Sequence, residues 1–229
     1  MKDALLEVIA CTVEDALEAE RGGADRLEII SRFDLGGLTP ALELVREIKA
    51  KVSLPLRVMV RESEGYVVSG ETEIKRLCAA AYAFKEIGVD GIVLGFLRRG
   101  EIDFELTQRI LACAPTLKAT FHHAFEDAAD KFAVIAKLKA LPQIDRILSH
   151  GGLTKNWAEK YSVLESYARA AQPEIEILAG GGVDREAINL LRKNTSVREF
   201  HTGSAARNGG QVDKSRVEEL VRTLRGNYD

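Results

Sequence analysis

Short runs of apolar and β-branched residues alternate with longer amphipathic runs along the whole chain. The short runs have the length and composition of strands, and eight are predicted: Leu5–Cys11, Arg26–Ile30, Leu56–Arg61, Gly91–Phe96, Leu117–His122, Arg146–Ser149, Glu174–Ala179 and Glu199–Thr202. The longer runs carry apolar residues at helical spacing and predict a helix after each strand, at residues 12–23, 40–50, 71–87, 103–113, 129–140, 157–171, 184–193 and 213–226.

Strands that alternate with helices pair in parallel through right-handed crossovers. Eight such units in 229 residues fit a closed barrel better than an open, doubly wound sheet, which stays the alternative. The units follow one another without a linker-like change in composition. We therefore expect an α/β fold in the form of a single-domain (β/α)8 TIM barrel that spans residues 1–229.

Charged residues recur at every second position of several predicted strands. Alternate side chains of a strand point to opposite faces, and helices cover the outer face of such a barrel, so the charged side chains should point inward. The inward positions are then Glu7, Ile9 and Cys11; Arg26, Glu28 and Ile30; Arg57, Met59 and Arg61; Lys118, Thr120 and His122; Glu174, Glu176 and Leu178; and Glu199, His201 and Gly203. The alternation does not decide the faces of the fourth and sixth strands.

The predicted barrel interior is therefore polar, and two interpretations are open. The charges form an ion-pair network that only fills the barrel, or they belong to an active site, where shifted pKa values and anion sites are expected. His122 and His201 come near the C-terminal ends of their strands, which is the end where barrel active sites lie. The candidate catalytic residues are Glu7, Arg26, Glu28, Arg61, His122 and His201.

Glycines follow the last two predicted strands. Backbone N–H groups can approach an anion closely at glycine, and the loops after strands seven and eight are the usual phosphate site of this fold. Ordinary turn chemistry is the competing explanation. The candidate anion-binding residues are Gly180, Gly181, Gly182, Gly203 and Ser204.

The composition excludes several classes of protein. The chain has 32 Lys and Arg against 35 Asp and Glu, a net charge of −3, which argues against a nucleic-acid binder and an electrostatic membrane anchor. No uncharged apolar run approaches the ~20 residues of a membrane span, and residues 1–7 do not resemble a targeting segment. The three cysteines cannot pair evenly, which indicates a reducing compartment. We expect a cytoplasmic protein with neither nucleic acid nor membrane as partner.

Seven short motifs occur in order between about residues 5 and 207: LLEV near the N-terminus, GADRLEI from Gly23, GGLTP from Gly36, MVR ending at Arg61, FHHAF from Phe121, GGGV from Gly180 and EFHTGSA from Glu199. In combination they resemble the CutC family, which is named for copper homeostasis. The resemblance implies a (β/α)8 barrel, a cytoplasmic location and a homo-oligomer. The family's polar barrel residues fall here on Glu7, Arg26, Glu28, Arg61, His122 and His201.

The resemblance also implies a copper ion in or near the barrel mouth. Its possible ligands in this chain are Cys11, Met59, His122 and His201. The family pattern has RVELC and LEVC where this chain carries Ile30 and Ile9 at the cysteine positions. Cu(I) prefers soft thiolate and thioether ligands, so this chain offers fewer of them than the pattern does.

The alternative function is an enzyme of the lyase or isomerase type that acts on a small anionic or phosphorylated metabolite. Arg61 and the backbones of 180–182 and 203–204 would hold the anion. His122 or Glu28 would be the acid or base, with Arg26 and Glu7 adjusting the carboxyl pKa. The expected partner is thus a metal ion or a small anion.

Overall fold

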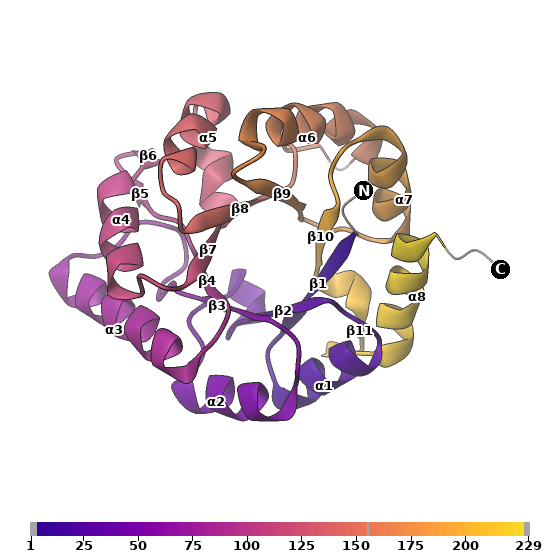
Figure 1. Ribbon diagram of the computed structural model, residues 1–229, viewed down its shortest axis with the longest axis horizontal. Coiled ribbons are helices and arrows are strands. Elements are labelled where there is room, and N and C mark those ends of the chain that lie inside the picture. The colour runs from indigo at the N-terminus through magenta and orange to yellow at the C-terminus, as the bar shows by residue number, and fades with distance from the viewer. Residues whose placement is uncertain (1–3, 155, 227–229) are drawn as a thin grey trace.

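All eight predicted strands are present and close into one barrel (Figure 1). The computed structural model describes residues 4–154 and 156–226. The barrel strands are β1 (Leu5–Ala10), β2 (Arg26–Ile29), β3 (Leu56–Met59), β4 (Gly91–Leu94), β7 (Lys118–Phe121), β8 (Ile144–Ser149), β9 (Glu176–Ala179) and β10 (Glu199–Thr202). They are parallel, in the order β1-β10-β9-β8-β7-β4-β3-β2, and β1 pairs with both β10 and β2. The closed ring confirms the TIM barrel and excludes the doubly wound sheet.

A ring of helices covers the outer face of the barrel (Figure 1). These helices are α1 (Val13–Arg21), α2 (Leu42–Lys51), α3 (Glu71–Ile87), α4 (Phe104–Cys113), α5 (Lys131–Lys139), α6 (Trp157–Ala171), α7 (Arg185–Asn194) and α8 (Lys214–Arg225). The hydroxyl of Thr12 accepts a hydrogen bond from the Asp15 backbone N–H at 3.0 Å and so caps the start of α1. Asp or Asn side chains cap α4 to α8 in the same way. Among the described residues, no helix combines the length and the apolar character needed to cross a membrane.

The predicted alternation of inward and outward side chains is present in the barrel. In β1, Leu6 and Val8 are wholly buried against the helices, and Glu7 between them is buried in the interior. Glu7 is the register partner of Arg26 on one side and of His201 on the other, so inward residues of neighbouring strands meet in layers.

Two residues expected inside the barrel lie at its exposed rim instead. Lys118 is the first residue of β7, and its ammonium donates to the Pro142 carbonyl at 3.0 Å. Glu174 precedes β9 and forms an ion pair with Lys139 at 2.9 Å. Both predictions are wrong. Glu174 lies outside β9, where the alternation of side chains has no meaning, and Lys118 begins β7, where its long side chain reaches the Pro142 carbonyl at the rim.

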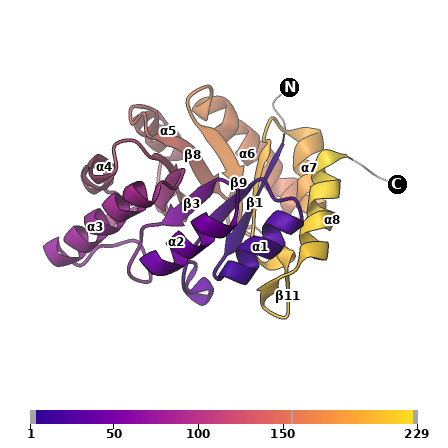
Figure 2. The ribbon, with the colours of Figure 1, turned by 60° about the horizontal axis from the view of Figure 1, so that its bottom comes forward.

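Several short elements interrupt the loops after the strands. The 3₁₀ helices η1 (Phe33–Leu35), η2 (His123–Asp127) and η3 (Ser204–Ala206) follow β2, β7 and β10. Two hairpins, β5 (Leu97–Arg98) with β6 (Glu101–Ile102) and β11 (Arg207–Asn208) with β12 (Gln211–Val212), follow β4 and β10. Figure 2 shows the hairpin of β11 beyond the C-terminal ends of the strands, next to α1 and α8. The sequence predicts none of these elements, yet 3₁₀ helices of this set carry residues of the site.

Candidate functional site

A network of ion pairs fills the part of the barrel beneath the C-terminal ends of the strands. Its members are Glu7, Arg26, Arg57, Asp145, Arg146 and Glu199. Arg26 forms ion pairs with Glu7 and, at 2.9 Å, with Glu199. Arg146 holds the Glu199 carboxylate with two hydrogen bonds of 2.6 and 2.9 Å. Because these charges neutralise one another, the ion-pair interpretation accounts for this layer.

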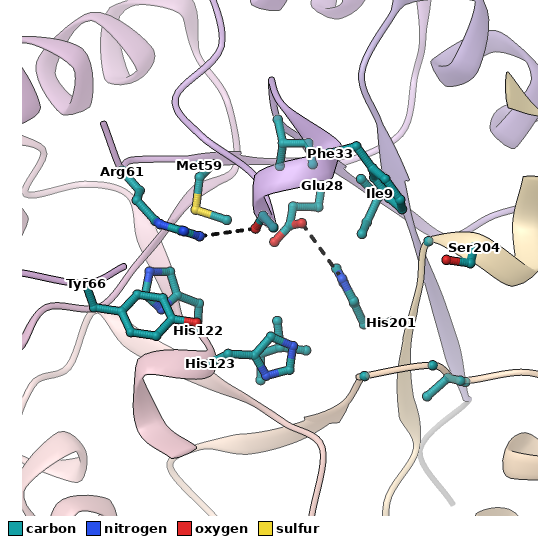
Figure 3. A pocket seen from close by; sticks show the side chains of 17 residues that line it. Ile9, Glu28, Phe33, Met59, Arg61, Tyr66, His122, His123, His201 and Ser204 are labelled. Carbon is teal, nitrogen blue, oxygen red and sulfur yellow. Dashed lines mark hydrogen bonds and ion pairs between the residues drawn. The ribbon is translucent and has the colours of Figure 1, made fainter. Parts of the chain in front are cut away.

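Glu28 and His201 face each other at the mouth of the barrel (Figure 3), and Glu7 of the network contacts His201 from below. Nε2 of His201 is 3.8 Å from Oε2 of Glu28, and Oε1 of Glu28 has no hydrogen-bond partner among the described residues. Burial raises the pKa of Glu28 to about 7, although His201 opposes the shift. Glu28 therefore exchanges its proton near neutral pH, which ordinary carboxyl groups do not.

Glu7 orients the imidazole of His201. Burial alone would raise the pKa of Glu7, but Arg26 and His201 outweigh it and hold this pKa below its usual range. Glu7 is therefore an ionised acceptor, and Nδ1 of His201 lies 2.8 Å from its Oε1. Burial would lower the pKa of His201, but Glu28 and Glu7 together raise it. The contact with Glu7 fixes the ring so that Nε2 faces Glu28.

A pocket of about 210 Å³ opens at the C-terminal ends of the strands (Figure 3). Its wall is formed by Ile9, Glu28, Ile30, Phe33, Gly36, Met59, Arg61, Tyr66, His122, His123, Leu148, Gly181, Gly182, Val183, His201, Gly203 and Ser204. The volume suits a small molecule, and this end of the barrel is where the active sites of the fold lie. Glu28 and His201 therefore line the same pocket as residues that lie on, or directly after, most of the barrel strands.

Arg61, Tyr66 and His122 form one side of the pocket (Figure 3). The guanidinium of Arg61 donates to the backbone carbonyls of five residues, namely Leu35, Gly36, Gly37, Ser63 and Gly65, and stands over the Tyr66 ring at 5.1 Å. No described carboxylate forms an ion pair with Arg61. Arg61 thus ties two loops of the pocket rim together and also leaves an uncompensated positive charge beside the pocket.

His122 is held as a neutral imidazole. Its Nδ1 accepts a hydrogen bond from the Ala124 backbone at 3.1 Å, so the proton of the neutral ring is on Nε2. Burial, followed by the charge of Arg61, lowers the pKa of His122 well below its usual value. Nε2 is buried and has no hydrogen-bond partner among the described residues, and the His122 side chain lines the pocket.

The glycine-rich loops divide into two groups. Four of the five predicted anion-binding residues line the pocket: Gly181, Gly182, Gly203 and Ser204. Gly181 and Gly182 have φ values of 76° and 92°, and their amides donate to no acceptor among the described residues. Gly180 does not line the pocket: its amide bonds to the Ser149 carbonyl, and a Cβ there would lie 2.5 Å from Leu148. Gly180 is therefore required for packing.

Three of the four possible copper ligands share the pocket. Met59, His122 and His201 line it, whereas Cys11 does not. Burial raises the pKa of the Cys11 thiol, and Arg207 donates to its sulfur at 3.7 Å. Ile9 and Ile30 line the pocket. The two cysteines of the family pattern occupy these positions and would therefore face the pocket, where this chain has apolar side chains instead.

The sequence did not single out His123, Glu126 and His150. His123 and Glu126 lie on η2 and His150 directly follows β8, and the ligand atoms of the three lie within 4.8 Å of one another. Burial, with further contributions from His201 and His150, lowers the pKa of His123 to about 3. A histidine at the C-terminal end of a strand is the sequence feature that could have identified His150. The sequence did not decide which face of the sixth strand points inward, so His150 was not selected.

The chain is similar to known proteins over nearly its whole length. The family model described as CutC family matches residues 4–223. A copper homeostasis protein cutC homolog of Homo sapiens is 33% identical over 198 residues, which cover 86% of this chain and 72% of the human protein. A CutC family protein of Xylella fastidiosa is 31% identical over 225 residues, which cover 98% of this chain and 83% of the relative.

A solved structure gives the same result. The CutC structure from Streptococcus agalactiae superposes on 88% of this chain and 98% of its own, with a TM-score of 0.82 and 27% identity. The barrel, the order of its motifs and the match over nearly the whole chain agree. The chain therefore belongs to the CutC copper homeostasis family.

Proposed function

We propose that the pocket binds a small anionic metabolite and that Glu28, with His201, transfers a proton to or from it. The observation that carries the proposal is the buried Glu28 carboxyl, which lines the pocket, has a pKa of about 7 and carries a buried oxygen with no hydrogen-bond partner among the described residues. A group that titrates near the working pH is the most effective general acid or base. Lyases and isomerases of small metabolites rely on such a proton transfer.

The remaining residues of the pocket supply complementary roles. Glu7 keeps His201 oriented, so that the imidazole can exchange a proton with Glu28 over a short path. The uncompensated charge of Arg61 and the open amides of Gly181 and Gly182 favour an anionic ligand. His122 offers a neutral N–H donor for a developing oxyanion.

A charge placed in the glycine loop tests the anion site. At Gly182, whose φ is 92°, a Cβ would meet nothing within 4 Å, so Gly182→Asp adds backbone strain but no clash, and its charge should weaken the binding of inorganic phosphate about tenfold or more. Gly210→Asp is the matched control, because Gly210 also has a positive φ, 88°, and open space, but lies outside the pocket. Isothermal titration with phosphate, then with a panel of phosphorylated and carboxylated metabolites, measures the effect.

The same panel tests the proton transfer. A metabolite that binds should exchange a C–H proton with D₂O, observed by proton NMR, and Glu28→Gln should slow the exchange by about 10² or more while the metabolite still binds. The proposal fails if no anion binds, or if Gly182→Asp binds phosphate as well as Gly210→Asp does. It also fails if exchange survives in Glu28→Gln.

Copper binding in the same pocket is the second candidate, and it rests on the names of the relatives and on three shared ligands. Met59 offers a thioether and His122 and His201 offer imidazoles, which suit Cu(I). If this function holds, the reduced protein binds one equivalent of Cu(I) against a competing chelator, and Met59→Leu loses it. Binding that survives Met59→Leu but is lost in Cys11→Ala would place the ion outside the pocket and contradict this candidate.

Two further properties belong to this proposal. We expect a cytoplasmic location and assembly as a homo-oligomer, with no nucleic acid or membrane as partner, from the balanced charge and from membership of the family. Light scattering of the purified protein measures the mass of the assembly directly, and a monomeric mass would contradict the oligomer.

A further inference from the structure

Two histidines and a glutamate converge at the ends of β7 and β8. His123 and Glu126 are three residues apart on the 3₁₀ helix η2, and side chains with this spacing eclipse one another on such a helix. β7 and β8 are neighbouring strands, so η2 and the residue after β8, His150, lie side by side. The imidazole centroids are 5.5 Å apart, and each of the three residues offers a ligand atom within 4.8 Å of the others.

The carboxylate of this cluster is held in place by the chain itself. Oε1 of Glu126 accepts hydrogen bonds from the Ser149 hydroxyl at 2.7 Å and from the His150 backbone at 2.8 Å. A Cβ at Gly181 would lie 2.5 Å from the Cβ of His150, so only glycine lets the loop after β9 pack so closely against this histidine. These contacts orient Glu126 and His150 before any ligand binds.

One nitrogen of each imidazole in the cluster lacks a partner within the described part of the chain. Nδ1 of His123 and Nδ1 of His150 are buried, and neither has a hydrogen-bond partner among the described residues. Nδ1 of His150 is 3.6 Å from Oε1 of Glu126, too far for a hydrogen bond. Two ligands of a tetrahedral zinc ion, each about 2.1 Å from the metal, are roughly 3.4 Å apart. The spacing thus suits two ligands of one ion better than it suits direct contact.

The donor set defines the class of ion. Two imidazoles and one carboxylate form the ligand set of catalytic zinc sites, and Cu²⁺ also binds imidazole well. The cluster has no thiolate or thioether, which disfavours Cu(I) at this position. We propose that His123, Glu126 and His150 bind one divalent transition-metal ion of the Zn²⁺ or Cu²⁺ kind at the wall of the pocket.

Zinc titration of the metal-free protein tests the site. We expect one Zn²⁺ per chain by isothermal titration and by metal analysis after dialysis. His123→Gln, His150→Gln and Glu126→Gln should each weaken binding by at least about 100-fold. Asp127→Asn is the matched control for Glu126→Gln, because it removes the same charge from the next, exposed residue and should bind Zn²⁺ like the parent.

A second cluster must be distinguished from this one. Glu7, Glu28 and His201 also lie close enough to share an ion, but they contain a single histidine. Cu²⁺ in the proposed site should show electron paramagnetic resonance coupling to two imidazole nitrogens. This measurement uses the parent protein and needs no substitution. Coupling to one nitrogen, or zinc binding that is lost in Glu28→Gln and kept in His150→Gln, would overturn the proposal, as would the absence of binding.

The site stands apart from the proton-transfer function. Glu28→Gln should leave zinc affinity unchanged even if it abolishes proton exchange, and His150→Gln should lose zinc even if no metabolite ever binds. Failure of one proposal is therefore visible without failure of the other.

Discussion

Replacing Arg26 with methionine should lower the free energy of unfolding by about 3–5 kcal/mol at neutral pH. Arg26 is 3% exposed and lies between two carboxylates, Glu7 and Glu199, which are 1% and 2% exposed. Methionine fills a similar volume, but it removes the ion pair that Arg26 forms with each carboxylate. An uncompensated charge is costly in the buried interior of the barrel. Urea denaturation followed by circular dichroism measures the loss.

The pH dependence identifies the cause of that loss. Burial tends to raise the pKa of Glu7, and in the native protein Arg26 and His201 outweigh it and hold this pKa down. Without Arg26, Glu7 can take up a proton, so the penalty should shrink as the pH falls toward about 4. Arg169→Met is the control, because Arg169 pairs with Glu165 at 2.8 Å on the exposed face of α6 and should cost less than about 1 kcal/mol. Equal losses in the two variants would show that the buried network contributes nothing special.

The inward positions of the barrel could be predicted because two simple constraints fix them. A strand has a period of two, and helices demand an apolar outer face, so Glu7, Glu28 and His201 had nowhere to point except inward. Where the alternation was weak the prediction stopped: Arg146 lies on β8, whose faces the sequence did not decide, and it proves to hold Glu199.

Other features of the site leave no pattern in the sequence. Arg61 is held by backbone carbonyls, which every residue possesses, so residue types could not reveal that it ties loops together. The elements η1 to η3 are too short to show a period. His123 and His150 are neighbours only because β7 and β8 pair, which follows from the fold and not from their spacing.

Glu28 is the residue at which stability and chemistry conflict. Its pKa in the folded protein is about 7 against an ordinary 4.5, and burial is the first cause. A carboxyl whose pKa is raised by folding stabilises the protein below its ordinary pKa, and this contribution is lost as the pH rises through about 7. A difference of this size corresponds to about 3 kcal/mol. Glu28 and Glu7 outweigh burial and raise the pKa of His201 as well, so its contribution to stability also falls as the pH rises.

Glu28→Gln should therefore make the protein more stable at about pH 8 by about 1–3 kcal/mol and change little at about pH 5, because glutamine stays neutral throughout. Urea denaturation at a series of pH values measures the difference, and Glu43→Gln, on the exposed face of α2, should show no such trend. A variant that is less stable than the parent at pH 8 would mean that Glu28 is an ionised partner of His201 and belongs to the ion-pair network. A gain would mean that the fold keeps a destabilising carboxyl in its pocket, and such a residue is retained for chemistry rather than for stability.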